Sequence, residues 1–281
     1  KAASAGRGLD KVFITGVSPL VMSDITSGYN VAVNIYLEPE LNDLCGFTEA
    51  EVMATVTPLV TACQLSEETA RQLRSLMQTF YNGYRFCRQE TTPLVYNPTL
   101  ALYFWRYFHK WCRSPGKMLD SNLAMDKNKL VYLASLPQGT PVIREALLGT
   151  SPLMINELSD RFSLTDLLKP NPDRSFMVSL LYYFGVLTLV GQTPLHELLF
   201  TIPNLVIRQL YVEQLHELTI PEDYARETNR QVARQFYRTG DLQPVCELLE
   251  HSYFPVFDNR DYRWADELTV KMAFVMLLFD D

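Results

Sequence analysis

Cysteine and histidine are the side chains best suited to metal binding or nucleophilic chemistry, and in this chain they are few and scattered. They are Cys45, Cys63, Cys87, Cys112 and Cys246, with His109, His196, His216 and His251. His109 and Cys112 have the spacing of a ligand pair, but no second pair accompanies them, and a closed zinc site needs four ligands. An odd number of cysteines without a CxxC motif predicts reduced, mostly buried thiols and no disulfides. We therefore expect no metal ion.

Phosphate binding and metal-assisted hydrolysis each need a motif that this sequence lacks. A P-loop requires GxxxxGK[ST], in which backbone amides and a lysine hold the phosphates. The only Gly-Lys pair, Gly116-Lys117, is followed by Met118, and Trp111 stands where the first glycine belongs. A PD-(D/E)xK nuclease centre requires an acid two residues before a lysine, and none of the eight lysines has one. We expect neither active site to be complete in this chain.

One set of residues has a spacing suited to binding an anionic polymer. Arginines recur every four residues at Arg226, Arg230, Arg234 and Arg238, beside Tyr224, Phe236 and Tyr237. We call the four arginines the arginine ridge, and such a ridge could follow nucleic-acid phosphates. The alternative is pairing along a helix surface, because Glu222 and Glu227 lie four and three residues before Arg226 and Arg230. We favour the surface-pairing interpretation.

The composition predicts a protein with a sizeable buried core. The chain has 281 residues, 47% of them hydrophobic, and its net charge of −7 argues against a protein that coats nucleic acid. The apolar runs are too short to cross a bilayer. We expect an intracellular protein, cytoplasmic or nuclear, without membrane contact. We interpret Lys1–Gly8 as a flexible leader, and the missing initiator methionine favours a fragment.

The elements that position these residues are predicted to be mostly helical. Capping residues indicate a helix from Glu49 to about Cys63 after the Thr48/Glu51 capping box, one from Ser66 to about Phe80, and one that begins at Asn97-Pro98. Between the last two, Tyr84–Cys87 and Pro93–Tyr96 are predicted as short strands of a hairpin. Near the start of the chain, Lys11–Leu20 has the pattern of a buried strand ended by a turn.

The best-defined unit spans Leu158–Leu215. Its predicted order is a helix at Leu164–Leu168, a helix at about Arg174–Phe184, strands at Val186–Val190 and Glu197–Ile202, and a closing helix from Pro203-Asn204. Helix, helix, hairpin is the order of a winged helix-turn-helix. Because no Arg or Lys lies between Phe176 and Val206, we expect this unit to be structural rather than DNA-binding.

Three further helices are predicted after this unit. They lie at Pro221–Thr239, from Asp241 to about Ser252, and at about Trp264–Phe279. The last carries an apolar stripe formed by Leu268, Met272, Val275 and Phe279. Leaving such a stripe in water costs about 25 cal/mol per Å². We therefore expect that helix to be buried against the preceding helices, a second copy or another chain.

Seven strings of the sequence, taken in order, resemble one family. They are VFITGVSPL at Val12, DITSGYN at Asp24, LNDLCGFTEAEV at Leu41, YNGYRF at Tyr81, YNP at Tyr96, LLYYFGVLT at Leu180 and IPN at Ile202. The set resembles the fungal branch of a family of AAA-like ATPases of unknown function that end in a PD-(D/E)xK nuclease-type domain. The resemblance covers nearly the whole chain, which looks like the middle of such a protein, without its Walker motifs and nuclease core.

The resemblance implies a division into three parts. Residues 1–97 would be the C-terminal part of an AAA-like ATPase core. Residues 98–218 would be a helical lid that contains the winged-helix-like unit. Residues 219–281 would be a helical linker and the first helix of the nuclease-type domain. The fold expected is α+β and predominantly helical, with a partial α/β ATPase-core segment before the lid.

The resemblance also implies roles for four side chains in the parent protein. Thr15, Ser18 and Arg85 would contact ATP, and Glu267 would supply an acid of the nuclease metal site. The alternatives are turn chemistry for Thr15 and Ser18, a surface ion pair for Arg85, and a solvated position near a helix N-terminus for Glu267. ATP and Mg²⁺ are expected only for the intact parent, and no cofactor is expected for this chain.

These observations favour a non-catalytic function. We expect a structural, lid and interaction region of an ATPase–nuclease-like protein, whose partners are its flanking domains, another protein chain or a second copy. The alternative is a nucleic-acid or protein docking module that uses the winged helix and the arginine ridge.

Overall fold

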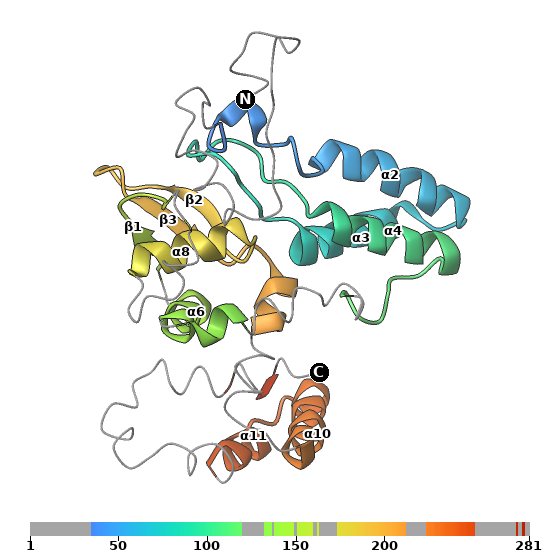
Figure 1. Ribbon diagram of the computed structural model, residues 1–281. Coiled ribbons are helices and arrows are strands. Elements are labelled where there is room, and N and C mark those ends of the chain that lie inside the picture. Colours follow the sequence, from blue (N-terminus) through green and yellow to red (C-terminus); the bar gives the residue numbers. More distant parts are fainter. Residues whose placement is uncertain are drawn as a thin grey trace.

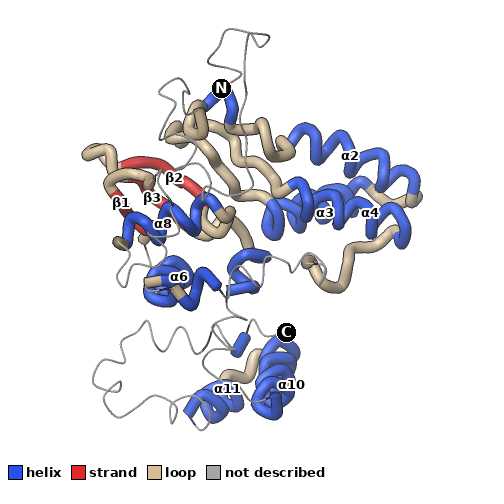
Figure 2. Tube along the Cα trace, in the orientation of Figure 1, coloured by secondary structure: helices blue, strands red, loops and turns tan. Residues whose placement is uncertain are grey.

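The computed structural model describes residues 35–119, 132–136, 138–148, 151–159, 162, 173–211, 223–250, 274, 277 and 278. The fold is α+β and predominantly helical, as predicted, with one three-stranded sheet among the described residues (Figures 1 and 2). Every described helix is too short or too polar to span a membrane. The predicted strand at Lys11–Leu20 lies outside the described residues.

The helical region comprises residues 35–119 and is built on three packed helices (Figure 1). After the short 3-10 helix η3 (Pro39–Leu41), these are α2 (Glu49–Ala62), α3 (Glu67–Tyr81) and α4 (Pro98–Trp111). Their inward faces share an aromatic-rich core in which Met77, Tyr81 and Phe104 are at most 1% exposed. Burying such side chains is the main stabilising contribution in this region.

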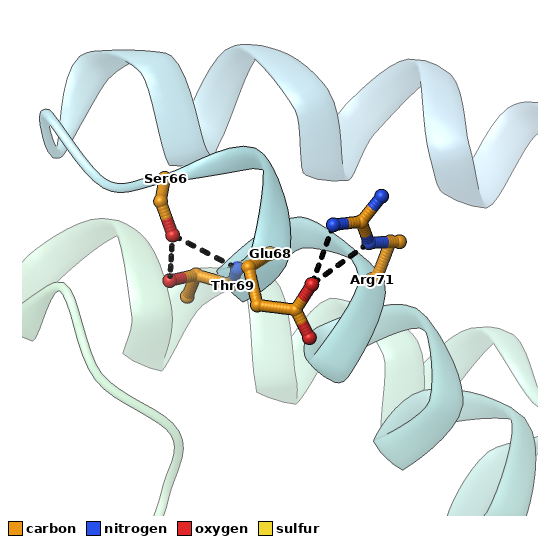
Figure 3. A network of polar contacts seen from close by, with 4 residues as sticks. All are labelled: Ser66, Glu68, Thr69 and Arg71. Atoms are coloured by element: carbon orange, nitrogen blue, oxygen red, sulfur yellow. Dashed lines mark hydrogen bonds and ion pairs between the residues drawn. The ribbon is translucent and has the colours of Figure 1, made fainter.

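Each of the three helices begins at its predicted capping residue. The hydroxyl of Thr48 accepts a hydrogen bond from the backbone N–H of Glu51, and the Glu51 carboxylate accepts one from the Thr48 N–H at 2.8 Å. The Glu51 carboxylate also accepts from the Thr48 hydroxyl at 2.8 Å, and its bonds to the Thr48 N–H and hydroxyl both favour the charged form and lower the pKa of Glu51. Ser66 caps α3 through the backbone N–H of Thr69 (Figure 3). Asn97 caps α4 through the N–H of Leu100. Sequence-local capping therefore fixes all three helix starts.

A disulfide joins Cys63 to Cys112, so the prediction of free thiols throughout the chain is wrong. Cys63 follows α2 and Cys112 follows α4, and their Cα atoms are 5.6 Å apart. In three consecutive helices that alternate in direction, the first and third end on the same side. Because the two cysteines are 49 residues apart, no local sequence pattern indicated this contact. Of the three free cysteines, only Cys87 is buried, so the expectation of mostly buried thiols is also wrong.

The sheet region comprises the described residues between 132 and 211. Its elements are α6 (Gly139–Leu148), β1 (Leu153–Ile155), α8 (Arg174–Tyr183), β2 (Thr188–Gln192), β3 (Leu198–Thr201) and a helical segment at 205–211. The strands are antiparallel in the order β1-β3-β2, and α8 packs beside the sheet and against α6 (Figure 1). This agrees with the helix and hairpin order predicted for a winged helix. The predicted helix at Leu164–Leu168 lies outside the described residues.

Two features of the sheet differ from the sequence prediction. β1 was not expected, because a three-residue strand has no periodicity of its own and exists through pairing with β3, where Leu153 faces Phe200. β2 begins at Thr188 rather than Val186, because the N–H groups of Val186 and Leu187 both donate to the carbonyl of Leu181 at the end of α8. Gly185, at a φ of 73°, ends the helix as such residues commonly do.

The C-terminal helices lie below the sheet region in Figure 1. They are α10 (Asp223–Thr239) and α11 (Gln243–Leu248), which pack against each other. The stripe of the predicted last helix lies outside the described residues, but Leu277 beside it is fully buried. The hydroxyl of Tyr237 on α10 donates to the carbonyl of Leu278 at 2.8 Å, which joins this segment to α10.

Candidate functional site: the seam between the two regions

The helical and sheet regions meet along a contact that we call the seam. It joins residues 82–98 of the helical region, which we call the arm, to β2 and the residues around 182–186 and 203–210. The arm is held as a hairpin by a bridge between Tyr84 and Val95, and a second bridge joins Tyr96 to Phe47. The predicted strands at Tyr84–Cys87 and Pro93–Tyr96 are thus reduced to single bridges.

Thr188, the first residue of β2, binds the backbone of the arm through its side chain. The backbone N–H of Arg85 donates to the Thr188 hydroxyl at 2.8 Å, and that hydroxyl donates to the Arg85 carbonyl at 3.4 Å. Thr188 is 2% exposed, so these partners could not be replaced by water without rearrangement. One side chain therefore satisfies both backbone groups of an arm residue and links the arm to β2.

The side chain of Arg85 extends along the same edge. Its Nη1 donates to the Val190 carbonyl at 2.9 Å and its Nε donates to the Thr92 carbonyl at 3.2 Å. Among the described residues, no carboxylate pairs with this half-buried guanidinium. Within the described part of the chain, the contacts that hold Arg85 are these backbone carbonyls, and the side chain joins the arm to β2.

Gly83 allows the two backbones to approach closely. It has a φ of +113°, and a Cβ at this position would lie 1.9 Å from the carbonyl oxygen of Pro203. Next to it, the side-chain amide of Asn204 donates to the carbonyl of Asn82 at 3.0 Å. Only glycine fits this part of the seam without displacing one region from the other.

Asn42 fixes the arm from the opposite side. It is 3% exposed, its Oδ1 accepts from the Phe86 N–H at 2.8 Å, and its Nδ2 donates to the Pro93 carbonyl at 3.0 Å. Both strands of the arm are thereby held by one side chain. Nothing in the local sequence around Asn42 or Thr188 indicated these roles, because their partners lie 44 and 103 residues away.

A partly open cavity of about 270 Å³ lies at the seam. Six aromatic side chains line it, namely Tyr84, Phe86, Tyr96, Tyr182, Tyr183 and Phe184. Aliphatic residues from both regions complete the wall, and Cys45 and Asn97 are the non-aromatic polar residues that line it among those described. Cys45 is exposed, so its thiol is accessible from outside.

The tyrosines at the seam are poor candidates for acid–base chemistry at neutral pH. Burial raises the pKa of Tyr182 and of Tyr96, and the hydrogen bond that the Tyr96 hydroxyl donates to the Glu49 carboxylate raises it further. Glu49 in turn accepts from Arg74 at 2.6 Å, which ties α2, α3 and the end of the arm together. The phenols of Tyr96 and Tyr182 therefore stay protonated, and that of Tyr96 acts as a hydrogen-bond donor.

The described strings of the family resemblance converge on this place. Five of the seven are described: those beginning at Leu41, Tyr81, Tyr96, Leu180 and Ile202. Each contributes a residue to the seam contacts or to the cavity wall. Segments that are far apart in the sequence thus form a single structural feature.

The remaining predicted site residues are not at the seam. Thr15, Ser18 and Glu267 lie outside the described residues, and so does the side chain of Arg226. On α10, Arg234 and Arg238 are exposed and Arg230 is half-buried, while Asn229 and Ala233 are buried on another face. Arg230 and Arg234 make contacts of their own. The predicted pairing with Glu222 and Glu227 stays a prediction.

The described residues contain no group of three or more His, Cys, Asp or Glu side chains that could hold a metal ion. Comparison of the chain with protein-family models, with curated proteins and with solved structures finds no match. The resemblance to an ATPase–nuclease family therefore stays a prediction from the sequence.

Proposed function

We propose that this chain is a non-catalytic structural and interaction module, in which the sheet region is a lid fixed to the helical region. The observation that carries the proposal is the pair of hydrogen bonds between Arg85 and Thr188, supported by the Arg85–Val190 bond. Through these contacts, the polar groups of the seam bind the sheet region to the helical region. In a larger ATPase–nuclease-like protein, such a unit would hold the flanking domains in a fixed relation.

ATP hydrolysis by the purified 281-residue chain tests the non-catalytic part of this proposal. We expect no turnover above that of a parallel preparation without the protein, with or without Mg²⁺. Turnover that survives further purification, and that Arg85→Met removes while the chain stays folded, would instead assign Arg85 to a nucleotide site.

The arginine ridge supports a second candidate function, which is binding of nucleic acid by α10. The exposure of Arg234 and Arg238 favours it, since exposed arginines at this spacing can contact successive phosphates. A gel-shift titration at several salt concentrations tests it, with the double variant Arg234→Ala/Arg238→Ala. Arg71→Ala is the matched control, because Arg71 is also an exposed helical arginine but lies on α3. Binding that is absent at low salt, or that both variants weaken equally, rules this function out.

A further inference from the structure

The cavity at the seam has a lining that attachment of the two regions does not require. We propose that it is a binding site for one uncharged, planar aromatic molecule of about two fused rings that carries a hydrogen-bond acceptor. This site goes beyond the structural role proposed above and does not rest on it. The seam can hold the two regions together whether or not the cavity is filled.

The size of the cavity sets the size of the ligand. An engineered apolar cavity of about 150 Å³ holds a benzene molecule. At about 270 Å³, the seam cavity is too large for one ring and matches two fused rings. Its lining comes from both regions, because Tyr84 and Phe86 lie on the arm whereas Ile207 and Leu210 lie on the helical segment of the sheet region.

The chemistry of the lining sets the charge and shape of the ligand. None of the described lining residues is Asp, Glu, Lys, Arg or His, so a charged molecule would lose its hydration without gaining an ionic partner. Aromatic rings pack favourably on one another in offset or edge-to-face arrangements. Tyr84 and Phe86, both on the arm, have nearly parallel rings with centroids 6.3 Å apart, an arrangement that a further flat ring can extend. A planar, uncharged ring system is the matching partner.

Asn97 provides the polar contact. Its Oδ1 accepts from the Leu100 N–H at 3.2 Å, which fixes the amide at the start of α4. The amide nitrogen donates to no other described residue, although Asn97 lines the cavity. A half-buried donor of this kind is satisfied by an acceptor on the ligand, such as a ring nitrogen or a carbonyl oxygen.

Two exposed thiols allow the site to be tested in the full chain. Cys45 lines the cavity and Cys246 lies on α11, away from it, so Cys246 is an internal reference. The probe is quinoline, which is uncharged at neutral pH and has a ring nitrogen. The measurement is the rate of alkylation of each thiol by iodoacetamide, determined by peptide mass spectrometry. We expect saturating quinoline to slow the alkylation of Cys45 at least about fivefold, because the ligand restricts access to the thiol. The alkylation rate of Cys246 should stay unchanged.

The charged analogue 2-naphthoate and two variants make the test specific. We expect no protection by 2-naphthoate. Ile207→Trp fills the cavity from the sheet side and should abolish protection by quinoline. Asn97→Asp keeps the oxygen that caps α4 and removes the donor. It should therefore weaken the affinity for quinoline about tenfold and leave the affinity for naphthalene, which has no acceptor, unchanged. Circular dichroism verifies that each variant is folded.

Several results would overturn the proposal. They are no protection of Cys45 up to the solubility limit of quinoline, equal protection by 2-naphthoate, or full protection in folded Ile207→Trp. Should Ile207→Trp not fold, Asn97→Asp decides, and an unchanged affinity for quinoline contradicts the site. None of these results tests the hydrogen bonds of the seam, which the Thr188→Val variant tests separately.

Discussion

The helix starts of the helical region and the short strand β1 of the sheet region are fixed by contacts of different sequence range. In the helical region each helix start is fixed by a capping side chain three residues away, as for Ser66 and Thr69. In the sheet region, β1 exists only through pairing across 47 residues, from Leu153 to Phe200. The seam belongs to the second kind, because Arg85 and Thr188 are 103 residues apart.

This difference predicts which substitutions destabilise one region and which destabilise both. A change inside one region should weaken that region first, whereas a change at the seam removes contacts that both regions share. Because residues in one network do not contribute additively, seam variants should be coupled to one another more strongly than to variants within a region. The predictions that follow use this contrast, from the largest expected effect to the smallest.

Gly83→Ala should have the largest effect. The added methyl group meets the Pro203 carbonyl oxygen at 1.9 Å and the backbone has a positive φ. We expect a loss of about 3–5 kcal/mol in the free energy of unfolding, measured by urea denaturation. Gly240→Ala is the matched control, because Gly240 has a φ of +71° with nothing within 4 Å of an added Cβ. Equal losses in the two variants would mean that backbone strain, not contact between the regions, explains the result.

Removing the disulfide should affect the helical region alone. Closing a loop of 49 residues restricts the unfolded chain, so Cys63→Ser/Cys112→Ser should cost about 2–4 kcal/mol. Hydrogen exchange should rise at the ends of α2 and α4 and stay unchanged in β2 and β3. Cys246→Ser, which removes an exposed free thiol, should have no effect. Faster exchange throughout the sheet would contradict the expectation that a change inside one region weakens that region first.

Thr188→Val should weaken both regions at once. The substitution keeps the shape of the side chain and leaves the N–H and carbonyl of Arg85 without their partner. We expect a loss of about 1–3 kcal/mol in urea denaturation. Thr201→Val is the control, since Thr201 is the β3 partner of Thr188, is half-buried and makes none of the seam hydrogen bonds described above. A loss of stability no larger than that of Thr201→Val would show that the Thr188 hydrogen bonds do not stabilise the two regions.

The ion pair between α6 and α8 should contribute least. Arg174 donates to Glu145 at 2.5 and 2.7 Å, and this hydrogen bonding lowers the pKa of Glu145. A lowered carboxyl pKa stabilises the fold above the unfolded pKa of about 4.3 and loses that contribution as pH falls through the folded pKa. Glu145→Gln should therefore cost about 0.5 kcal/mol at neutral pH and nothing at strongly acidic pH. A cost that does not change with pH would exclude the charge of Glu145 as its source.

The sequence predicted the features that depend on neighbouring residues. The starts of α2, α3 and α4 follow from Thr48, Ser66 and Asn97, because a cap acts within one turn. Turn residues predicted α8, β2 and β3 of the sheet region, and the predicted start of β2 lies two residues before the observed one.

The features that it did not predict depend on distant partners. The disulfide, β1 and the role of Thr188 each need the fold to bring two segments together, and no local pattern encodes those contacts. Arg85 was selected from the sequence as a candidate phosphate contact, and its bonds to Thr92 and Val190 were visible only in the structure.

Hydrogen–deuterium exchange of the full chain tests the central claim most directly. If the seam unites the two regions, the amide of Arg85 is protected in the native protein, although it lies outside regular secondary structure. The account predicts that Thr188→Val removes this protection and also speeds exchange in β2, while Thr201→Val leaves the arm unchanged. Rapid exchange at Arg85 in the unsubstituted protein, as in a solvated loop, would contradict the account.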